Sequence, residues 1–170
     1  MIRSGGEGDG RAIAAVHETA RRAYYDRAEG LGVDAAAVLE PHPDRLAMWD
    51  VLLRDPARAT VLCAEVDGQV VGFLSMGRPL HPHPEGGRAL ELHALYVVPA
   101  TWTRGIGSQL HDRFAHELGA GPFTRGVLDV WSRNDRAIAF YESRGWRADG
   151  RSRPAPDGTT YRGMSCAPAR

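Results

Sequence analysis

The amino-acid sequence predicts a mixed α/β fold, with a central β-sheet of about six to seven strands flanked by about four helices. Segments with strand patterns alternate along the 170 residues with segments whose apolar residues recur at helical spacing, and glycine- or proline-containing turns separate them. Apolar residues make up 43% and charged residues 25% of the chain, as is typical of a globular protein. The length suits a single domain spanning residues 1–170, and no repeat or linker divides it.

Charge and cysteine content argue against several classes of protein. The 21 basic residues, all of them arginine, balance the 21 acidic residues, whereas nucleic-acid-binding and membrane-surface proteins carry a basic excess or stripe. No apolar run approaches the roughly 18 residues of a membrane-spanning helix, and residues 1–10 lack the apolar stretch of a signal peptide. Cys63 and Cys166 are too few for a disulfide framework, and their spacing matches no zinc site. We therefore expect a cytoplasmic protein with no metal, no nucleic-acid partner and no membrane partner.

The start of the chain is expected to form one short strand and two helices. Apolar residues at helical spacing define the helices, and an aspartate or a proline stands where each begins. The expected elements, in order, are a strand at residues 2–3, a helix capped by Asp9 and running to about Tyr24, an irregular stretch at 27–40, and a helix from Pro43-Asp44 to Asp55-Pro56.

Three strands are expected next. Residues 59–66 and 69–76 flank the dipeptide Asp67-Gly68, which is a strong signal for a tight hairpin turn. Residues 77–88 contain glycine, proline and histidine and are expected to form a loop. Its His81-Pro82-His83-Pro84 run favours a plain loop over a metal site, because no cluster of carboxylates accompanies it. Residues 89–98 form the third strand, which Pro99 ends.

The rest of the chain alternates helices and strands. The expected elements are a helix at residues 105–118 broken by glycines at 119–121, a strand at 127–131, a helix capped by Asn134 or Asp135 and ending near Arg144, a strand starting at Gly145-Trp146, a turn at 154–158 and a last strand at 159–166.

The most informative segment is residues 95–108, where a strand ends, glycines follow and an amphipathic helix begins. Gly105 and Gly107 let the backbone approach a ligand closely. The first N–H groups of the helix have no partner inside it, and together with the helix dipole they favour a phosphate group. Arg104 adds positive charge. A lone Gly-x-Gly is also common in ordinary strand–helix connections, so the turn alone does not decide the function.

A longer stretch of the sequence resembles the GNAT (general control-related N-acetyltransferase) superfamily. In that family the turn has the pattern Q/R-x-x-G-x-G/A, and residues 102–107 (WTRGIG) fit it except that Trp102 replaces the first Gln or Arg. Residues 127–146 resemble the second hallmark of the family: a strand, Asn134, a helix containing Phe140-Tyr141, and a Gly-aromatic pair. The resemblance covers residues 59–146 well and the remainder only in outline.

The resemblance implies which residues bind the acyl donor, an acetyl-coenzyme A. The backbone at the end of the strand would pair with the pantetheine amides, with the N–H of Val97 or a neighbour as oxyanion donor, and the turn would bind the pyrophosphate. The implied donor-binding residues are Leu95, Tyr96, Val97, Trp102, Thr103, Arg104, Gly105, Ile106, Gly107, Ser108 and Asn134. Asn134 can also act simply as a helix cap.

Two residues compete for the role of general base. Glu91 matches the position of a glutamate in histone-acetylating members of the family, and its apolar neighbours would disfavour the charged carboxylate. Strand periodicity puts residues 91, 93, 95 and 97 on one face. His93 is the alternative base, because histidine titrates near neutrality. Glu91 could equally be a solvated carboxylate, and His93 a half-buried side chain bonded to a neighbour.

Tyr141 is the candidate general acid, because the matching tyrosine of the family points at the thioester sulfur. Its other interpretation is an aromatic ring packed on the core. The sequence thus predicts an N-acetyltransferase that moves an acetyl group from acetyl-coenzyme A to an amine of a small molecule or peptide by direct attack in a ternary complex, and a homodimer is one assembly that it could form. The alternatives are a non-catalytic acyl-coenzyme A-binding module, or an enzyme that takes its acyl group from aminoacyl-tRNA, which the zero net charge disfavours.

Overall fold

The computed structural model describes residues 1–25, 44–84, 88–156 and 158–168, so the stretch expected to be irregular at 27–40 lies outside the described residues. Its helices and strands follow the predicted order and confirm the predicted mixed α/β fold. In chain order they are β1 (Ile2–Ser4), the short helix η1 (Glu7–Asp9), α1 (Gly10–Tyr25), α3 (Asp44–Arg54), β2 (Ala59–Val66), β3 (Gln69–Gly77), β4 (Ala89–Val97), the short helix η4 (Pro99–Thr101), α4 (Ile106–Ala120), β5 (Arg125–Trp131), α5 (Asp135–Glu142), β6 (Arg147–Pro154) and β7 (Thr160–Cys166).

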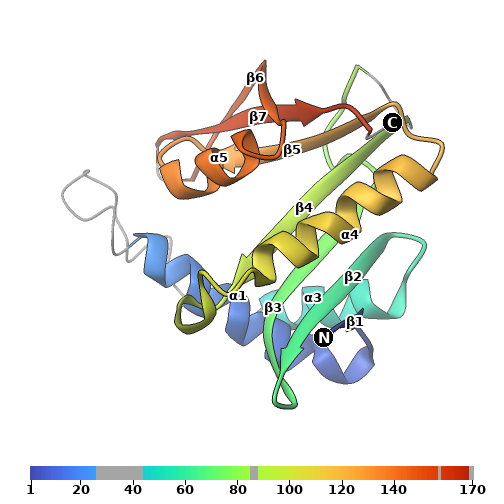
Figure 1. Ribbon diagram of the computed structural model, residues 1–170, viewed down its shortest axis with the longest axis vertical. Helices are drawn as coiled ribbons and strands as arrows, with labels where there is room; N and C mark the ends of the chain where they lie inside the picture. Colours follow the sequence, from blue (N-terminus) through green and yellow to red (C-terminus); the bar gives the residue numbers. More distant parts are fainter. Residues whose placement is uncertain (26–43, 85–87, 157, 169–170) are drawn as a thin grey trace.

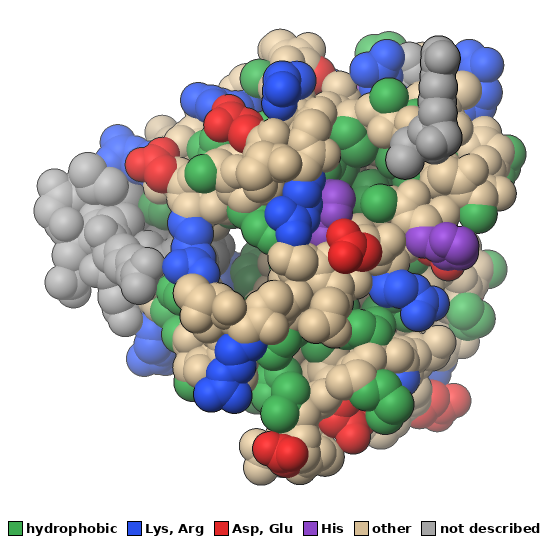
Figure 2. Space-filling model, in the orientation of Figure 1, with side chains coloured by type: hydrophobic (Ala, Val, Ile, Leu, Met, Phe, Trp, Pro, Cys, Tyr) green, Lys and Arg blue, Asp and Glu red, His purple; other side chains and the backbone are tan. Residues whose placement is uncertain are grey.

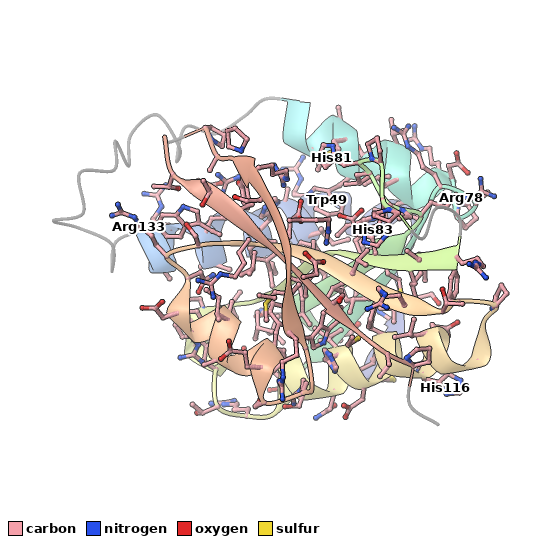
Figure 3. The ribbon with its side chains drawn as sticks, turned by 90° about the horizontal axis from the view of Figure 1, so that it is seen from above. Trp49, Arg78, His81, His83, His116 and Arg133 are labelled. Atoms are coloured by element: carbon pink, nitrogen blue, oxygen red, sulfur yellow. The ribbon has the colours of Figure 1, made fainter. Side chains whose placement is uncertain are left out.

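The strands form one seven-stranded sheet in the order β1-β2-β3-β4-β5-β7-β6. Neighbouring strands are antiparallel except β4 and β5, which are parallel. Helix α4 lies along one face of the sheet and α1 and α3 along the other (Figure 1). The view from above shows α3 and α4 on opposite sides of the strands (Figure 3). The sheet therefore has two faces with separate packing partners.

Each face of the sheet buries its own apolar cluster. On one side Leu110 and Phe114 of α4 and Tyr141 of α5 pack against the strands. On the other side Ile13 of α1 and Trp49 of α3 do so. Alternate residues of a strand point to opposite faces, so both faces can be apolar only where successive residues are apolar. The continuous apolar runs of β2 and β3 meet this requirement.

The hairpin between β2 and β3 confirms the prediction made from Asp67-Gly68. Both turn residues are left-handed, with φ values of 51° and 75°, and Val66 pairs with Gln69 on either side of them. A two-residue turn with this geometry matches the twist of the flanking strands, and Asp-Gly is among the dipeptides that tolerate it best.

The prediction that Asp9 caps the first long helix is wrong. Asp9 is the last residue of η1, and its carboxylate accepts hydrogen bonds from the Gly6 N–H at 2.8 Å and from Arg3 at 2.7 Å. The salt bridge with Arg3 holds the pKa of Asp9 below its usual value. The carboxylate therefore ties η1 to β1, a contact that spacing along a helix cannot reveal.

The end of α4 also differs from the prediction. Gly119 was expected to break the helix, but the helix continues to Ala120, and the Gly121 N–H still donates to the Glu117 carbonyl at 3.0 Å. A glycine inside a helix costs about 1 kcal/mol relative to alanine. The adjacent Leu118 is buried in the core and offsets that cost.

A β-bulge in β4 changes which side chains share a face. Ser75 of β3 pairs with Ala94, but the next residue, Met76, pairs with Leu92, so His93 is an extra residue in β4. One extra residue reverses the alternation of side chains beyond it. The prediction that residues 91, 93, 95 and 97 share one face is therefore wrong.

Because of the bulge, the Glu91 side chain lies on the opposite face of β4 from Leu95 and Val97, and not on the same face. Leu92 before the bulge and Leu95 and Val97 after it all pack in the cluster beneath α4. Tyr96 packs in the cluster beneath α1 and α3. Glu91 alternates with Leu92 and so lies on the same face of β4 as Tyr96.

Beneath α4, His111 forms a buried hydrogen bond with Trp146. The indole Nε1–H donates to His111 Nε2 at 2.9 Å, which requires that this nitrogen be unprotonated. Burial, and secondarily the positive charge of Arg144, lowers the pKa of His111 to about 4. The native state therefore holds a neutral histidine where the unfolded chain would titrate near its ordinary value of about 6.5.

This histidine should make the protein acid-sensitive. Because the folded-state pKa is depressed, the stabilisation is complete above about pH 6.5 and is lost as pH falls toward 4, by up to about 3 kcal/mol. We expect His111→Gln, whose amide oxygen can still accept from Trp146, to flatten the dependence of the free energy of unfolding on pH. Urea unfolding across that range measures it. His116→Gln, exposed on the same helix (Figure 3), is the control; an unchanged slope in His111→Gln contradicts the assignment.

Both cysteines are free thiols, and burial raises the pKa of Cys63 and of Cys166 to about 11. They stay protonated near neutrality and pack as small apolar groups. Within the described part of the chain, no helix combines the length and the apolar character needed to cross a membrane.

Candidate active site

The strands β4 and β5 diverge in the middle of the sheet and leave one edge of β4 open. They pair only from Ala89 to Glu91 on β4, and beyond that point the two strands separate. The Val98 N–H still donates to Val71 of β3 at 2.9 Å. Because N–H groups alternate in direction along a strand, the N–H of Val97 points the opposite way, toward the opening.

A pocket of about 360 Å³ occupies this opening. In Figure 2 it is a hollow with an apolar floor between α5 and the start of α4, with basic side chains around its rim. Its lining comes from α1, the end of β4, the glycine turn and α5. The lining residues are Ala20, Leu95, Tyr96, Val97, Thr101, Trp102, Thr103, Gly105, Ile106, Gly107, Ser108, Asn134, Arg136, Ala137, Phe140 and Tyr141.

The glycine turn presents the start of α4 to this pocket. Gly105 is the N-cap residue and is left-handed, with a φ of 77°, a conformation that glycine adopts without strain. The first hydrogen bond of α4 runs from Gln109 N–H to the Gly105 carbonyl at 3.0 Å. The N–H groups of residues 106–108 therefore have no partner within the helix and lie at its positive end. This arrangement suits a phosphate group.

Trp102 ties the turn to the strand end. Its indole Nε1–H donates to the Val97 carbonyl at 2.7 Å. That carbonyl was expected to be available to a ligand together with its neighbours, and it is instead held by the protein. The N–H of Val97 is left as the hydrogen-bonding group of that residue on the open edge.

Helix α5, which follows β5 in the chain, closes the pocket on the side opposite β4. Asn134 caps it by accepting from the Ala137 N–H at 3.1 Å, and the same residue lines the pocket. Tyr141 is the seventh residue of this eight-residue helix, with 8% of its surface exposed, and its ring packs against Trp146 at a centroid distance of 5.7 Å. Burial, and to a smaller extent Tyr96, raises the pKa of Tyr141 above its usual value. The phenol therefore keeps its proton and can donate it.

The two base candidates lie outside the pocket lining. Glu91 is 8% exposed, and its carboxylate accepts from the Leu80 N–H at 2.6 Å. The His93 Nε2 lies 2.9 Å from the Arg78 carbonyl. Both contacts come from the loop after β3, whose Arg78, His81 and His83 lie on the side of the sheet where Trp49 is found (Figure 3). The described residues contain no group of three or more metal-binding side chains, at this loop or elsewhere.

The residues that line the pocket also differ from those that the sequence predicts. Arg104, expected beside the phosphate, lines a separate hollow with Met1 and Gln109. Sequence reasoning missed five lining residues. They are Ala20, Thr101, Arg136, Ala137 and Phe140. Ala137 could have been found, because it lies three residues after Asn134 and four before Tyr141, and the helical repeat brings such neighbours onto one face.

Comparison with known proteins agrees with this geometry. A model of the Acetyltransferase (GNAT) family matches residues 13–146. An uncharacterized N-acetyltransferase of Lactobacillus delbrueckii subsp. lactis is 36% identical over 84 residues, which are 48% of this chain and 47% of that protein. The match therefore spans about half the length of this relative, and the same share of a probable N-acetyltransferase of Mycobacterium tuberculosis.

Two solved structures share the fold along nearly the whole chain. An N-acetyltransferase from Staphylococcus aureus has a TM-score of 0.75 at 21% identity, covering 99% of this chain and 98% of that one. An N-acetyltransferase from Thermoplasma acidophilum, solved in complex with coenzyme A, has a TM-score of 0.73 at 18% identity, with 98% of each chain covered. With the family model matching well over half of its residues, the chain belongs to the GNAT acetyltransferase family.

Proposed function

We propose that the protein is an N-acetyltransferase that transfers the acetyl group of acetyl-coenzyme A to an amine of a small molecule or peptide, as a single domain. The observation that carries the proposal is the pocket in which the open edge of β4, the first turn of α4 and the Tyr141 side chain meet. The Thermoplasma acidophilum protein of similar fold, solved with coenzyme A, supports the choice of donor. The pyrophosphate would lie on the N–H groups of residues 106–108 and the pantetheine arm along Leu95 to Val97.

In this proposal the amine nitrogen attacks the carbonyl carbon of the thioester while both substrates are bound. A carbon–nitrogen bond forms, and the carbonyl oxygen becomes an oxyanion that the Val97 N–H stabilises. When the intermediate collapses, the carbon–sulfur bond breaks and the thiolate takes a proton from the Tyr141 phenol. The amine must lose one proton to a base or to solvent. Holding the two reactants together supplies much of the rate acceleration.

Glu91 is our candidate for that base, acting through a water molecule. Glu91 is on the same face of β4 as Tyr96, which lines the pocket, so water on that side of the sheet would have to carry the proton from the amine to the carboxylate. His93, the other candidate, has its Nε2 beside the Arg78 carbonyl. A base must be deprotonated, so the rate should rise with pH and then level off.

We expect Glu91→Gln to slow the reaction and remove this rise of kcat with pH, and His93→Gln to keep it. Profiles of kcat against pH measure both, with amines of different basicity, because the amine must also be neutral to react. If the rise follows the basicity of the amine while Glu91→Gln remains fully active, the protein has no dedicated base at Glu91.

The function itself is tested by thiol release from acetyl-coenzyme A in the presence of amines, peptides and amino-sugar antibiotics. We expect amine-dependent release of coenzyme A and the acetylated amine by mass spectrometry. Tight binding of coenzyme A with no turnover on any amine would instead indicate a non-catalytic acyl-coenzyme A-binding module.

A further inference from the structure

Two lining residues of the pocket, Trp102 and Arg136, form a stacked pair. The guanidinium carbon of Arg136 lies 4.0 Å from the centroid of the Trp102 ring. The ring is held in turn by the hydrogen bond from its Nε1–H to the Val97 carbonyl. A planar guanidinium stacks well on an indole, and the contact restricts its movement. The strand end therefore holds a positive charge at the rim of the pocket.

Arg136 does not stabilise α5, the helix on which it lies. Arg136 is the second residue of Asp135–Glu142, at the positive end of the helix dipole, where a cation is unfavourable. Among the described residues, no ion pair compensates Arg136. A charge in this place is stabilised when an anion binds beside it.

The start of α4 contributes the positive end of a second helix dipole to the same pocket. Phe140, one turn after Arg136 on α5, lies 3.8 Å from the position that a Cβ of Gly107 would occupy. The start of α4 therefore lies against the second half of α5, and Arg136 lines the same pocket as Gly105, Gly107 and Ser108. Helix N-termini and a guanidinium are the groups that bind phosphate oxygens most readily, the guanidinium through two parallel hydrogen bonds. Trp102 carries no charge and Arg104 lines a separate hollow, so the cation among the residues that line the pocket comes from α5.

We propose that Arg136, stacked on Trp102, binds a phosphate group of coenzyme A and sets the affinity for the donor. The inference rests on the proposed function, because it requires coenzyme A in the pocket. Both the pyrophosphate and the 3′-phosphate offer the required oxygens. Arg136 thus adds a cationic side chain to the backbone N–H groups that the glycine turn offers to the phosphate.

The test is calorimetric titration of the wild type and Arg136→Gln with coenzyme A, dephospho-coenzyme A and pantetheine. We expect Arg136→Gln to bind coenzyme A about tenfold or more weakly and to bind pantetheine, which has no phosphate, as the wild type does. The difference for coenzyme A should shrink at high salt, because ions screen the charge. A loss that persists with dephospho-coenzyme A assigns the pyrophosphate, and one that disappears assigns the 3′-phosphate.

Two further variants separate charge from packing. Arg113→Gln removes one exposed positive charge from α4 outside the pocket lining and should bind coenzyme A like the wild type. Trp102→Leu removes the stacking surface, so Arg136→Gln should cost less in that background than in the wild type. In steady-state kinetics Arg136→Gln should raise the KM for acetyl-coenzyme A and leave kcat unchanged at saturation.

Two results would overturn the inference. One is an Arg136→Gln variant that binds coenzyme A as tightly as the wild type. The other is an equal loss of affinity for coenzyme A and pantetheine, since the side chain would then act only by shaping the pocket. A wild-type protein that binds no coenzyme A at all would refute the proposed function, and the two failures are therefore distinguishable.

Discussion

Gly107→Val should abolish measurable binding of coenzyme A while the protein remains folded. A Cβ at Gly107 would lie 3.8 Å from Phe140 and 3.9 Å from Leu95, which is ordinary contact, so the first added carbon fits. The two methyl groups of valine must extend beyond it, between the ligand and the N–H groups that begin α4. Phosphate binding there depends on close approach of the backbone. We expect a loss of about 100-fold or more, on the order of 3 kcal/mol.

Calorimetry measures this loss, and thermal unfolding checks that the fold survives. Gly107→Ala adds only the carbon that fits and should retain most of the affinity. Gly119→Val is the matched control, because Gly119 is exposed near the far end of the same helix. Gly107→Val binding coenzyme A like the wild type would show that the ligand does not approach the start of α4.

Tyr141→Phe should lower kcat by about 10²- to 10⁴-fold, as is typical when a general acid is lost. Phenylalanine keeps the ring that packs on Trp146, so the fold and the affinity for coenzyme A should change little. Because burial raises the pKa of Tyr141, the phenol stays protonated across neutral and mildly alkaline pH. No fall in rate attributable to Tyr141 is therefore expected below about pH 10.

Stopped-flow thiol release at saturating acetyl-coenzyme A measures the effect on kcat. Tyr161→Phe is the control: Tyr161 lies on β7 outside the pocket lining, where its ring carries the guanidinium of Arg153 at 4.0 Å. We expect that variant to turn over normally. Wild-type turnover in Tyr141→Phe would show that the Tyr141 ring serves packing and that the thiolate leaves without its help.

The elements that the sequence predicted correctly depend on residues close together in the chain. The Asp67-Gly68 turn requires left-handed backbone at two adjacent residues, and glycine and aspartate tolerate it. The Asn134 cap requires one side chain and an N–H three residues away. The start of α4 at Gly105 is likewise a local choice. Such signals are set by a few neighbours, and they fix the order and type of the elements.

The predictions that failed depend on contacts between separate elements of the fold. Asp9 bonds to Arg3 of β1, across the turn that follows that strand. The face on which Glu91 lies was predicted wrongly because a bulge at His93 has no sequence signature. Where a bulge falls is decided by the register of β4 against β3, which is a property of the pair.

By itself, the sequence determined the order of the helices and strands, the glycine turn and the family to which the chain belongs. Only the tertiary structure decided how far β4 and β5 stay paired, and hence where the pocket opens. It also brought Arg136 onto Trp102, from an element that begins after the next strand. The physical reason is range: backbone preferences act between near neighbours, whereas strand register and side-chain stacking are fixed by the packing of the whole sheet against its helices.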